Sequence, residues 1–305
     1  MLNVDLACSI AGFSLVGVAC ALYGVRVMVR GVAKFDRVAK DKGSALFGAS
    51  LMQMGYWWLD YLGRGLSALG ATANGISLAS LVLGIGAGVA LAFGHFGVGA
   101  LLAVLSALGD TLDGIVARLQ GTASDAGEVL DAAVDRYEEF FFLGGIVVHV
   151  RQSAVGVSLV LLALLGSFMV SYATAKAEAL RAEVPRGAMR RPERAAYLII
   201  GAGLTPILAP FIASQGGTGW LLELPALGAV GLVALVGNVS AVRRLAKLFA
   251  AVGKPRVPVA VPVLATLESP TPMDAPEPMK ADVMVDSSVT RAREPEALVP
   301  IDATR

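Results

Sequence analysis

Long apolar runs alternate with short polar connections along most of this chain. A transmembrane helix needs about 20 predominantly apolar residues to cross the hydrocarbon core of a bilayer. Runs of about that length lie near residues 5–25, 75–94, 96–117, 129–150, 154–176, 195–214 and 220–242. The pattern therefore predicts an all-α integral membrane protein with seven spans.

Two segments do not follow the pattern of the spans. Residues 46–69 mix apolar, aromatic and charged side chains, as is typical of an amphipathic helix at the membrane interface. Residues 251–305 are rich in proline and poor in aromatics, so we expect a disordered cytoplasmic tail that buries no core. The predicted organisation is thus an N-terminal transmembrane helix with a basic linker (1–45), a membrane domain (46–250) and the tail.

Composition agrees with this pattern and narrows the chemistry. The 305-residue chain is 56% hydrophobic and 16% charged, with a mean hydropathy of +0.69, whereas soluble domains carry about 25% charged residues. Cys8 and Cys20 share one apolar run and are interpreted as small apolar fillers. His95 and His149 are isolated at span ends, where structural roles are favoured. Membrane lipids are the expected surroundings, and no nucleic-acid partner is expected.

Basic residues are distributed unevenly between the connections. They crowd 26–42, 118, 176–194 and 243–247, whereas the connections near 95, 151 and 216 contain only Arg151. Cytoplasmic connections carry an excess of lysine and arginine. The distribution therefore predicts an N-terminus outside, a C-terminus inside, and basic connections in the cytoplasm.

Four aspartates are carried by segments that are otherwise apolar. Asp110 and Asp113 are spaced i,i+3, and Asp131 and Asp135 are spaced i,i+4, so each pair lies on one helix face. Carboxylates at membrane depth are costly, and they are therefore rare and usually functional. Four that converge from two helices require positive charge, and hard cations such as Mg²⁺ and Mn²⁺ prefer carboxylate oxygens. We predict a site for two such ions.

Small and basic residues accompany these carboxylates. Gly114 follows Asp113 directly, and Gly127 stands one turn before Asp131. A glycine lets a bulky ligand approach the backbone closely. Arg118 lies one turn beyond Gly114, from where an arginine can bind a phosphate bidentately. Together they predict a pyrophosphate site that faces the cytoplasm.

Two other interpretations of the aspartates are open. One is structural, because Asp135 is followed by Arg136 and a local charge pair is possible. The other is an ion or proton transporter that uses the carboxylates as a relay, although transport alone would not require the glycines and the arginine at these offsets. Solvated roles are expected for the remaining acidic residues of the region, which are Asp125, Glu128, Glu138 and Glu139.

The whole pattern resembles the signature of the CDP-alcohol phosphatidyltransferase family. The chain reads Asp110-x-x-Asp113-Gly114-x-x-Ala117-Arg118, then eight residues, then Gly127-x-x-x-Asp131-x-x-x-Asp135, and all eight fixed positions agree. The resemblance covers about residues 46–250. It implies six core membrane helices, a homodimer, and transfer of a phosphatidyl group from a CDP-lipid such as CDP-diacylglycerol to a small alcohol, with release of CMP.

The same resemblance assigns roles to the signature residues. It implies that Asp110, Asp113, Asp131 and Asp135 ligate the two Mg²⁺ or Mn²⁺ ions. Asp135 would also act as the base on the acceptor hydroxyl. The residues implied to line the CDP pocket are Gly114, Ala117, Arg118 and Gly127.

A further resemblance concerns the acceptor. Residues 171–178 and Arg191-Pro192-Glu193-Arg194 resemble segments of the bacterial phosphatidylinositol-phosphate synthase branch. That branch implies a bacterial inner membrane and an inositol phosphate acceptor, whose phosphate would be bound here by Lys176, Arg191, Arg194 and Arg243. The chain departs at Thr174, where the branch carries a lysine. Glycerol 3-phosphate is the alternative acceptor, and the positive-inside bias alone also explains the arginines.

Overall fold

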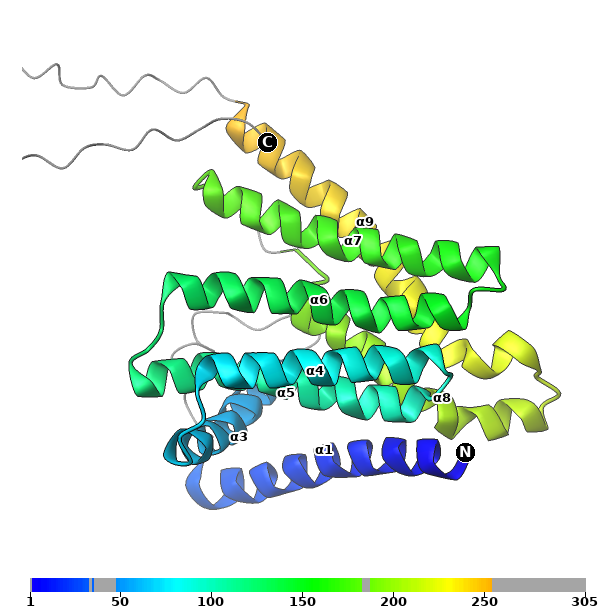
Figure 1. Ribbon diagram of the computed structural model, residues 1–305, viewed down its shortest axis with the longest axis horizontal. Coiled ribbons are helices and arrows are strands. Elements are labelled where there is room, and N and C mark those ends of the chain that lie inside the picture. Colours follow the sequence, from blue (N-terminus) through cyan, green and yellow to red (C-terminus); the bar gives the residue numbers. More distant parts are fainter. Residues whose placement is uncertain (1, 33–34, 36–47, 183–186, 254–305) are drawn as a thin grey trace, which may run out of the picture. The chain divides into compact units, whose positions relative to one another are not determined.

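The computed structural model describes residues 2–32, 35, 48–182 and 187–253 and folds them mainly into helices (Figure 1). The elements are α1 (Leu2–Arg30), α3 (Ala49–Ala68), α4 (Ala73–Ala92), α5 (Phe96–Gln120), α6 (Asp125–His149), α7 (Ala154–Ala179), α8 (Arg191–Ser214), the 3-10 helix η1 (Gly219–Glu223) and α9 (Leu224–Val252). These residues form no strand, so the predicted all-α class is confirmed. Most of the predicted tail and much of the basic linker lie outside the described residues.

Six segments are long and apolar enough to cross a membrane. They are Val4–Arg30, Ala73–Ala92, Phe96–Gln120, Ala154–Ala179, Arg191–Ser214 and Gly219–Val252. The remaining long helix, α6, has 25 residues, but its first half is acidic. Its membrane crossing stays a prediction, and α3 occupies the segment predicted to lie at the interface.

The ends of several helices gather their basic residues on one side. The C-terminal ends of α1, α5, α7 and α9 lie at the left of Figure 1, as does the start of α6. The last turns or nearby residues of these four helices carry Arg30, Arg118, Lys176 and Lys247. The alternation of basic and neutral connections in the sequence therefore corresponds to two different ends of the helix bundle.

A tight turn joins the two helices that carry the aspartates. α5 ends at Gly121, whose φ of 68° is left-handed and favours glycine. Ser124 then caps α6 by accepting a hydrogen bond from the Gly127 N–H at 3.2 Å. The chain thereby reverses direction within a few residues, and the two aspartate pairs face a common space.

Glycines let α4 and α6 approach each other closely. A Cβ added at Gly145 of α6 would overlap with the carbonyl oxygen of Gly88 of α4. One added at Gly84 would lie 3.0 Å from Cγ of Glu138 and 3.1 Å from Oγ of Ser106. The glycines of α4 therefore make room for the acidic face of α6 beside α5.

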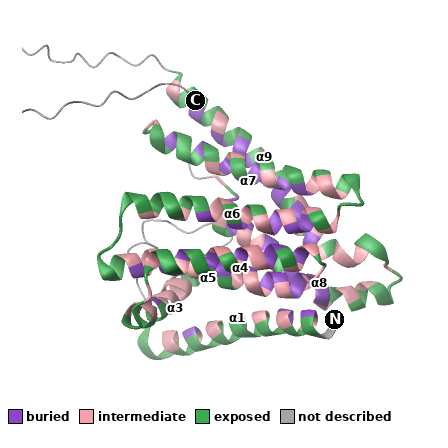
Figure 2. Ribbon diagram, viewed as in Figure 1, coloured by how far each residue is buried: buried purple, intermediate pink, exposed green. Residues whose placement is uncertain are grey.

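Helix α1 packs on α5 and α8 through few but specific contacts. The carboxylate of Asp5 accepts a hydrogen bond from the N–H of Val98 at 2.9 Å, in the first turn of α5. His95, the residue before that helix, provides no side-chain cap, so Asp5 replaces it. Farther along, the Trp58 indole of α3 donates to the Ala19 carbonyl at 3.2 Å. Figure 2 shows that most of α1 is nevertheless exposed.

Candidate active site

The aspartates predicted to bind metal lie on facing parts of α5 and α6. Asp110 and Asp113 are buried, with 8% and 5% of their surface exposed, and Asp131 and Asp135 are partly buried. Their burial matches the expectation that these carboxylates do not simply face solvent. The local pair of Asp135 with Arg136 is present but long, at 3.9 Å.

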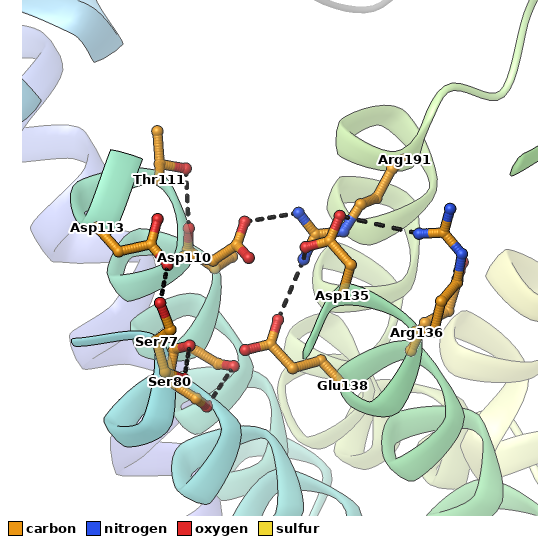
Figure 3. Close-up of polar contacts among 12 residues, drawn as sticks. Ser77, Ser80, Asp110, Thr111, Asp113, Asp135, Arg136, Glu138 and Arg191 are labelled. Atoms are coloured by element: carbon orange, nitrogen blue, oxygen red, sulfur yellow. Dashed lines mark hydrogen bonds and ion pairs between the residues drawn. The ribbon is translucent and has the colours of Figure 1, made fainter. Parts of the chain in front are cut away.

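A guanidinium from a third helix stands among the carboxylates (Figure 3). Nη1 of Arg191, in the first turn of α8, lies 2.6 Å from Oδ2 of Asp110. Its Nη2 lies 2.5 Å from Oδ1 of Asp135 and 3.1 Å from Oε2 of Glu138. One cation therefore connects three acidic residues that come from two other helices.

The same three carboxylates have the geometry of a metal site. One oxygen of each of Asp110, Asp135 and Glu138 lies within 4.8 Å of the others. Oδ1 of Asp110 is buried and has no hydrogen-bond partner among the described residues. An all-oxygen donor set of this kind suits hard divalent cations, so the residues present fit Mg²⁺ or Mn²⁺. The Arg191 guanidinium shows that positive charge is stabilised at this point.

Asp113 and Asp131 face a polar cavity on the other side of Asp110. Its volume is about 1080 Å³. The Asp113 carboxylate accepts a short hydrogen bond from the Ser77 hydroxyl of α4. The cavity is lined by seven of the eight signature residues: Asp110, Asp113, Gly114, Ala117, Arg118, Gly127 and Asp131. The spacing of the signature thus corresponds to one continuous wall.

Gly114 lies where the arginine of the signature reaches back along α5. A Cβ added at Gly114 would stand 3.3 Å from Nη1 of Arg118. That distance is tight, so a larger residue would displace the guanidinium. The glycine therefore allows Arg118 to lie against the backbone of its own helix, at the wall of the polar cavity.

A second, mostly apolar cavity of about 550 Å³ begins at the carboxylate cluster. Asp135, Glu138 and Arg191 line its charged end. Asp110 and Thr111 line both cavities. The charged cluster therefore stands between a large polar space and an apolar one.

The basic residues predicted to bind an acceptor are not all together. Arg191 is in the carboxylate cluster, whereas Lys176 and Arg243 are exposed. Arg194 is only 1% exposed, and its nitrogens are held by protein. Nε and Nη2 bind the two oxygens of Glu139 at 2.8 and 3.0 Å, and Nη1 binds the Met189 carbonyl at 2.9 Å. An acceptor phosphate at Arg194 would have to replace these partners.

Three residues of the site region were missed by the sequence analysis. Glu138 and Glu139 were interpreted as solvated, which is wrong, because Glu138 is buried against Arg191 and Glu139 holds Arg194. Glu138 falls one turn after Asp135 on the same face as the aspartates, and that spacing was the available signal.

The third missed residue is Arg244, the neighbour of the predicted Arg243. Arg244 is buried, and its Nη1 donates to Oγ1 of Thr174 at 2.9 Å. Its Nη2 donates to the Gly187 carbonyl at 3.0 Å. Arg244 continues the buried face of α9 set by Gly237, Ser240 and Ala241. Arg244 follows these small residues at helical spacing, whereas Arg243 does not. That spacing in the sequence would have distinguished the buried arginine from the exposed one.

Comparison with known proteins agrees with this geometry. The sequence profile of the CDP-alcohol phosphatidyltransferases matches residues 71–240. The chain is 32% identical over 188 residues to the phosphatidylinositol phosphate synthase of Mycobacterium marinum, an alignment of 60% of this chain and 76% of that protein. It is 35% identical over 150 residues to the synthase of Corynebacterium glutamicum, covering 47% and 68% of the two chains.

Solved structures show the same fold. The phosphatidylinositol phosphate synthase of Mycobacterium tuberculosis in complex with manganese and citrate aligns with a TM-score of 0.55 and 26% identity. That alignment covers 64% of this chain and 90% of the synthase. The structure of the same synthase with CDP-DAG bound gives a TM-score of 0.54 and 25% identity, over 64% and 95% of the chains.

The chain belongs to the CDP-alcohol phosphatidyltransferase family, because the profile matches more than half of it. It is an integral membrane protein and a metal-dependent transferase of phospholipid synthesis. Family membership also decides between the two classes left open by the carboxylates, in favour of the enzyme over the ion transporter.

Proposed function

We propose that this protein transfers a phosphatidyl group from CDP-diacylglycerol to inositol phosphate and releases CMP. The observation that carries the proposal is the position of the carboxylate cluster between the two cavities. The polar cavity has the volume and the charged wall for a nucleotide diphosphate, and the apolar one begins where the lipid would be attached. The similarity to phosphatidylinositol phosphate synthases favours this acceptor.

Each part of the site then has a chemical task. Asp110, Asp113, Asp131 and Asp135 would hold the Mg²⁺ or Mn²⁺ ions, which when bound would supply positive charge against the pyrophosphate and the departing CMP. Gly114, Ala117 and Gly127 leave space for CDP along the helix backbones, and Arg118 pairs with its phosphates. Asp135 accepts the proton of the acceptor hydroxyl, whose oxygen attacks the phosphorus that carries the lipid.

The acceptor phosphate needs a cation close to this base. Arg191 lies 2.5 Å from Asp135, nearer than Arg136 at 3.9 Å. It also begins α8, where the helix dipole favours an anion. We therefore assign the acceptor phosphate to Arg191 first. Lys176, Arg194 and Arg243 remain the further residues proposed from the resemblance. Arg194 is the least available of them, because it is only 1% exposed and protein groups enclose its guanidinium.

The acceptor assay is the direct test of the proposed function. Purified protein with CDP-diacylglycerol should release CMP when Mg²⁺ or Mn²⁺ and inositol phosphate are present. EDTA should abolish the release, and either ion should restore it, because the buried carboxylates need a divalent cation. Inositol, glycerol 3-phosphate and water serve as competing acceptors in parallel reactions. Faster release with glycerol 3-phosphate would identify the alternative acceptor, and release that persists without metal would contradict the two-metal site.

We also propose that the protein is a homodimer of a bacterial inner membrane with the active site facing the cytoplasm. The basic ends of α5, α7 and α9 support this orientation. In a variant with Cys8 and Cys20 replaced by alanine, a cysteine at Gln215 should react with an impermeant maleimide added outside intact cells. A cysteine at Lys176 should react only after lysis. The reverse labelling would contradict the proposed orientation. The homodimer is tested separately, by measuring the mass of the protein in detergent with light scattering.

A further inference from the structure

The apolar cavity has one wall that lies outside the region matched by the family. That region begins at residue 71, whereas α1 ends at Arg30. Five residues of α1 nevertheless line the cavity: Cys8, Ser9, Gly12, Phe13 and Val16. The other walls come from α4, α5, α6 and α8. A helix outside the matched region therefore forms one wall of a space that begins at the carboxylate cluster.

The cavity extends away from the charged cluster along the membrane-crossing direction of α5. Thr111 lines it at one end and Gly97 at the other, so at 1.5 Å of rise per residue it follows α5 for about 21 Å. That length is more than half of the roughly 30 Å hydrocarbon core of a bilayer. Its charged lining residues gather at the Asp110 end, and the remainder is mostly apolar. A headgroup at the cluster would thus project a hydrocarbon chain into it.

The position of α1 beside the cavity is set by named contacts rather than by loose apolar packing. Asp5 caps the first turn of α5, and the absence of a side chain at Gly97 lets the backbone of α1 come close there. Phe13 reaches across to Gly203 of α8, where an added Cβ would stand 3.2 Å from the ring. Contacts with both α5 and α8 therefore fix α1 in place as a wall of the cavity.

We propose that this cavity holds one acyl chain of the CDP-lipid and that α1 sets the length of chain the enzyme accepts. The proposal rests on the proposed function, because the lipid is the substrate of the same site. The volume of the apolar cavity, about 550 Å³, is in the range of pockets that bind a small ligand. A hydrocarbon chain matches the lining, since burying each methylene is favourable by about 0.8 kcal/mol.

Two glycines of α1 provide a matched pair of substitutions. A Cβ at Gly12 would meet only Cδ1 of Leu101, at 3.9 Å, and Gly12 lines the cavity. Gly17, farther along the helix, has nothing within 4 Å of an added Cβ and does not line it. Gly12→Leu should therefore fill part of the cavity, whereas Gly17→Leu adds the same side chain outside it. Phe13→Ala should do the opposite and enlarge the space.

The experiment compares these variants with lipids of different chain length. The ratio of kcat/KM for CDP-dioleoylglycerol to that for CDP-dioctanoylglycerol should fall about tenfold in Gly12→Leu, as expected when about two methylenes lose their burial. The ratio should be unchanged in Gly17→Leu and should rise in Phe13→Ala. An equal ratio in all four proteins would overturn the proposal.

A binding measurement separates this proposal from the proposed function. CDP-diacylglycerol with a diazirine near the end of one acyl chain is photolysed with the protein in Mg²⁺ and without any acceptor alcohol, so that binding is measured without turnover. Adducts should map to residues 8–16 of α1, and Gly12→Leu should reduce them. Adducts confined to other helices would overturn the role of α1, even if CMP release proceeds normally. Adducts on α1 without CMP release from any acceptor would instead overturn the proposed function.

Discussion

Asp110→Asn should lower CMP release about a thousandfold while the protein remains folded. Asp110 lines both cavities and holds Nη1 of Arg191 at 2.6 Å. The amide keeps the shape of the side chain but removes the negative charge that ligates a divalent cation. Loss of charge stabilisation at a transferring phosphoryl group costs several kcal/mol, and about 1.4 kcal/mol corresponds to each tenfold. Initial rates of CMP release at saturating CDP-lipid measure the effect.

The fold should survive this substitution because the cluster contains more acidic than basic groups. Arg191 keeps its ion pairs with Asp135 and Glu138 when Asp110 is neutral. Mn²⁺ binding, followed by electron paramagnetic resonance, should weaken in parallel with the rate. Asp60→Asn is the matched control, because Asp60 lies on α3, away from the cluster, and forms an i,i+4 pair with Arg64. A variant that binds Mn²⁺ normally but is inactive would show that Asp110 has a role other than metal binding.

The sequence predicts the helices well because the membrane imposes a simple length rule. The expected span near 75–94 corresponds to Ala73–Ala92, and the one near 154–176 to Ala154–Ala179. The signature likewise predicts one wall of the polar cavity, since i,i+3 and i,i+4 spacing places its residues on one helix face. Span length and the helix face of a residue both depend on residues that are close in sequence, so the sequence pattern alone is sufficient to predict them.

The partners of the arginines could not be predicted in the same way. Arg191 and Arg194 both begin α8 and differ by about one turn, yet one contacts Asp110 and the other Glu139. Their partners come from residues more than fifty positions away, so the choice depends on how α6 and α8 pack. The interpretation of Glu138 and Glu139 as solvated failed for the same reason. An acidic pair at the start of an apolar stretch gives no sign of the cations that face it.

The contacts of Arg194 lead to an expected result that differs from phosphate binding. Arg194→Ala should reduce the yield of folded protein and lower its Tm by about 6–20 °C. Removing one partner of a buried ion pair leaves the other charge uncompensated, which costs about 3–5 kcal/mol, and each kcal/mol shifts Tm by about 2–4 °C in a protein of this size. Here the stranded group is the Glu139 carboxylate, which Arg194 binds through two nitrogens. Thermal unfolding in detergent, followed by circular dichroism, measures the shift.

A double variant separates the positioning role from a role in acceptor binding. Arg194→Met combined with Glu139→Gln removes both charges, so most of the lost stability should return, because a neutral pair of similar size leaves no buried ion. If Arg194 acts only by holding α8 against α6, the double variant should also recover its KM for inositol phosphate. If Arg194 instead binds the acceptor phosphate, KM should stay raised by about one to two orders of magnitude in a fully folded double variant, as expected for a lost charge-assisted hydrogen bond. That second outcome would place the acceptor at Arg194 and overturn its assignment to Arg191 as the first contact.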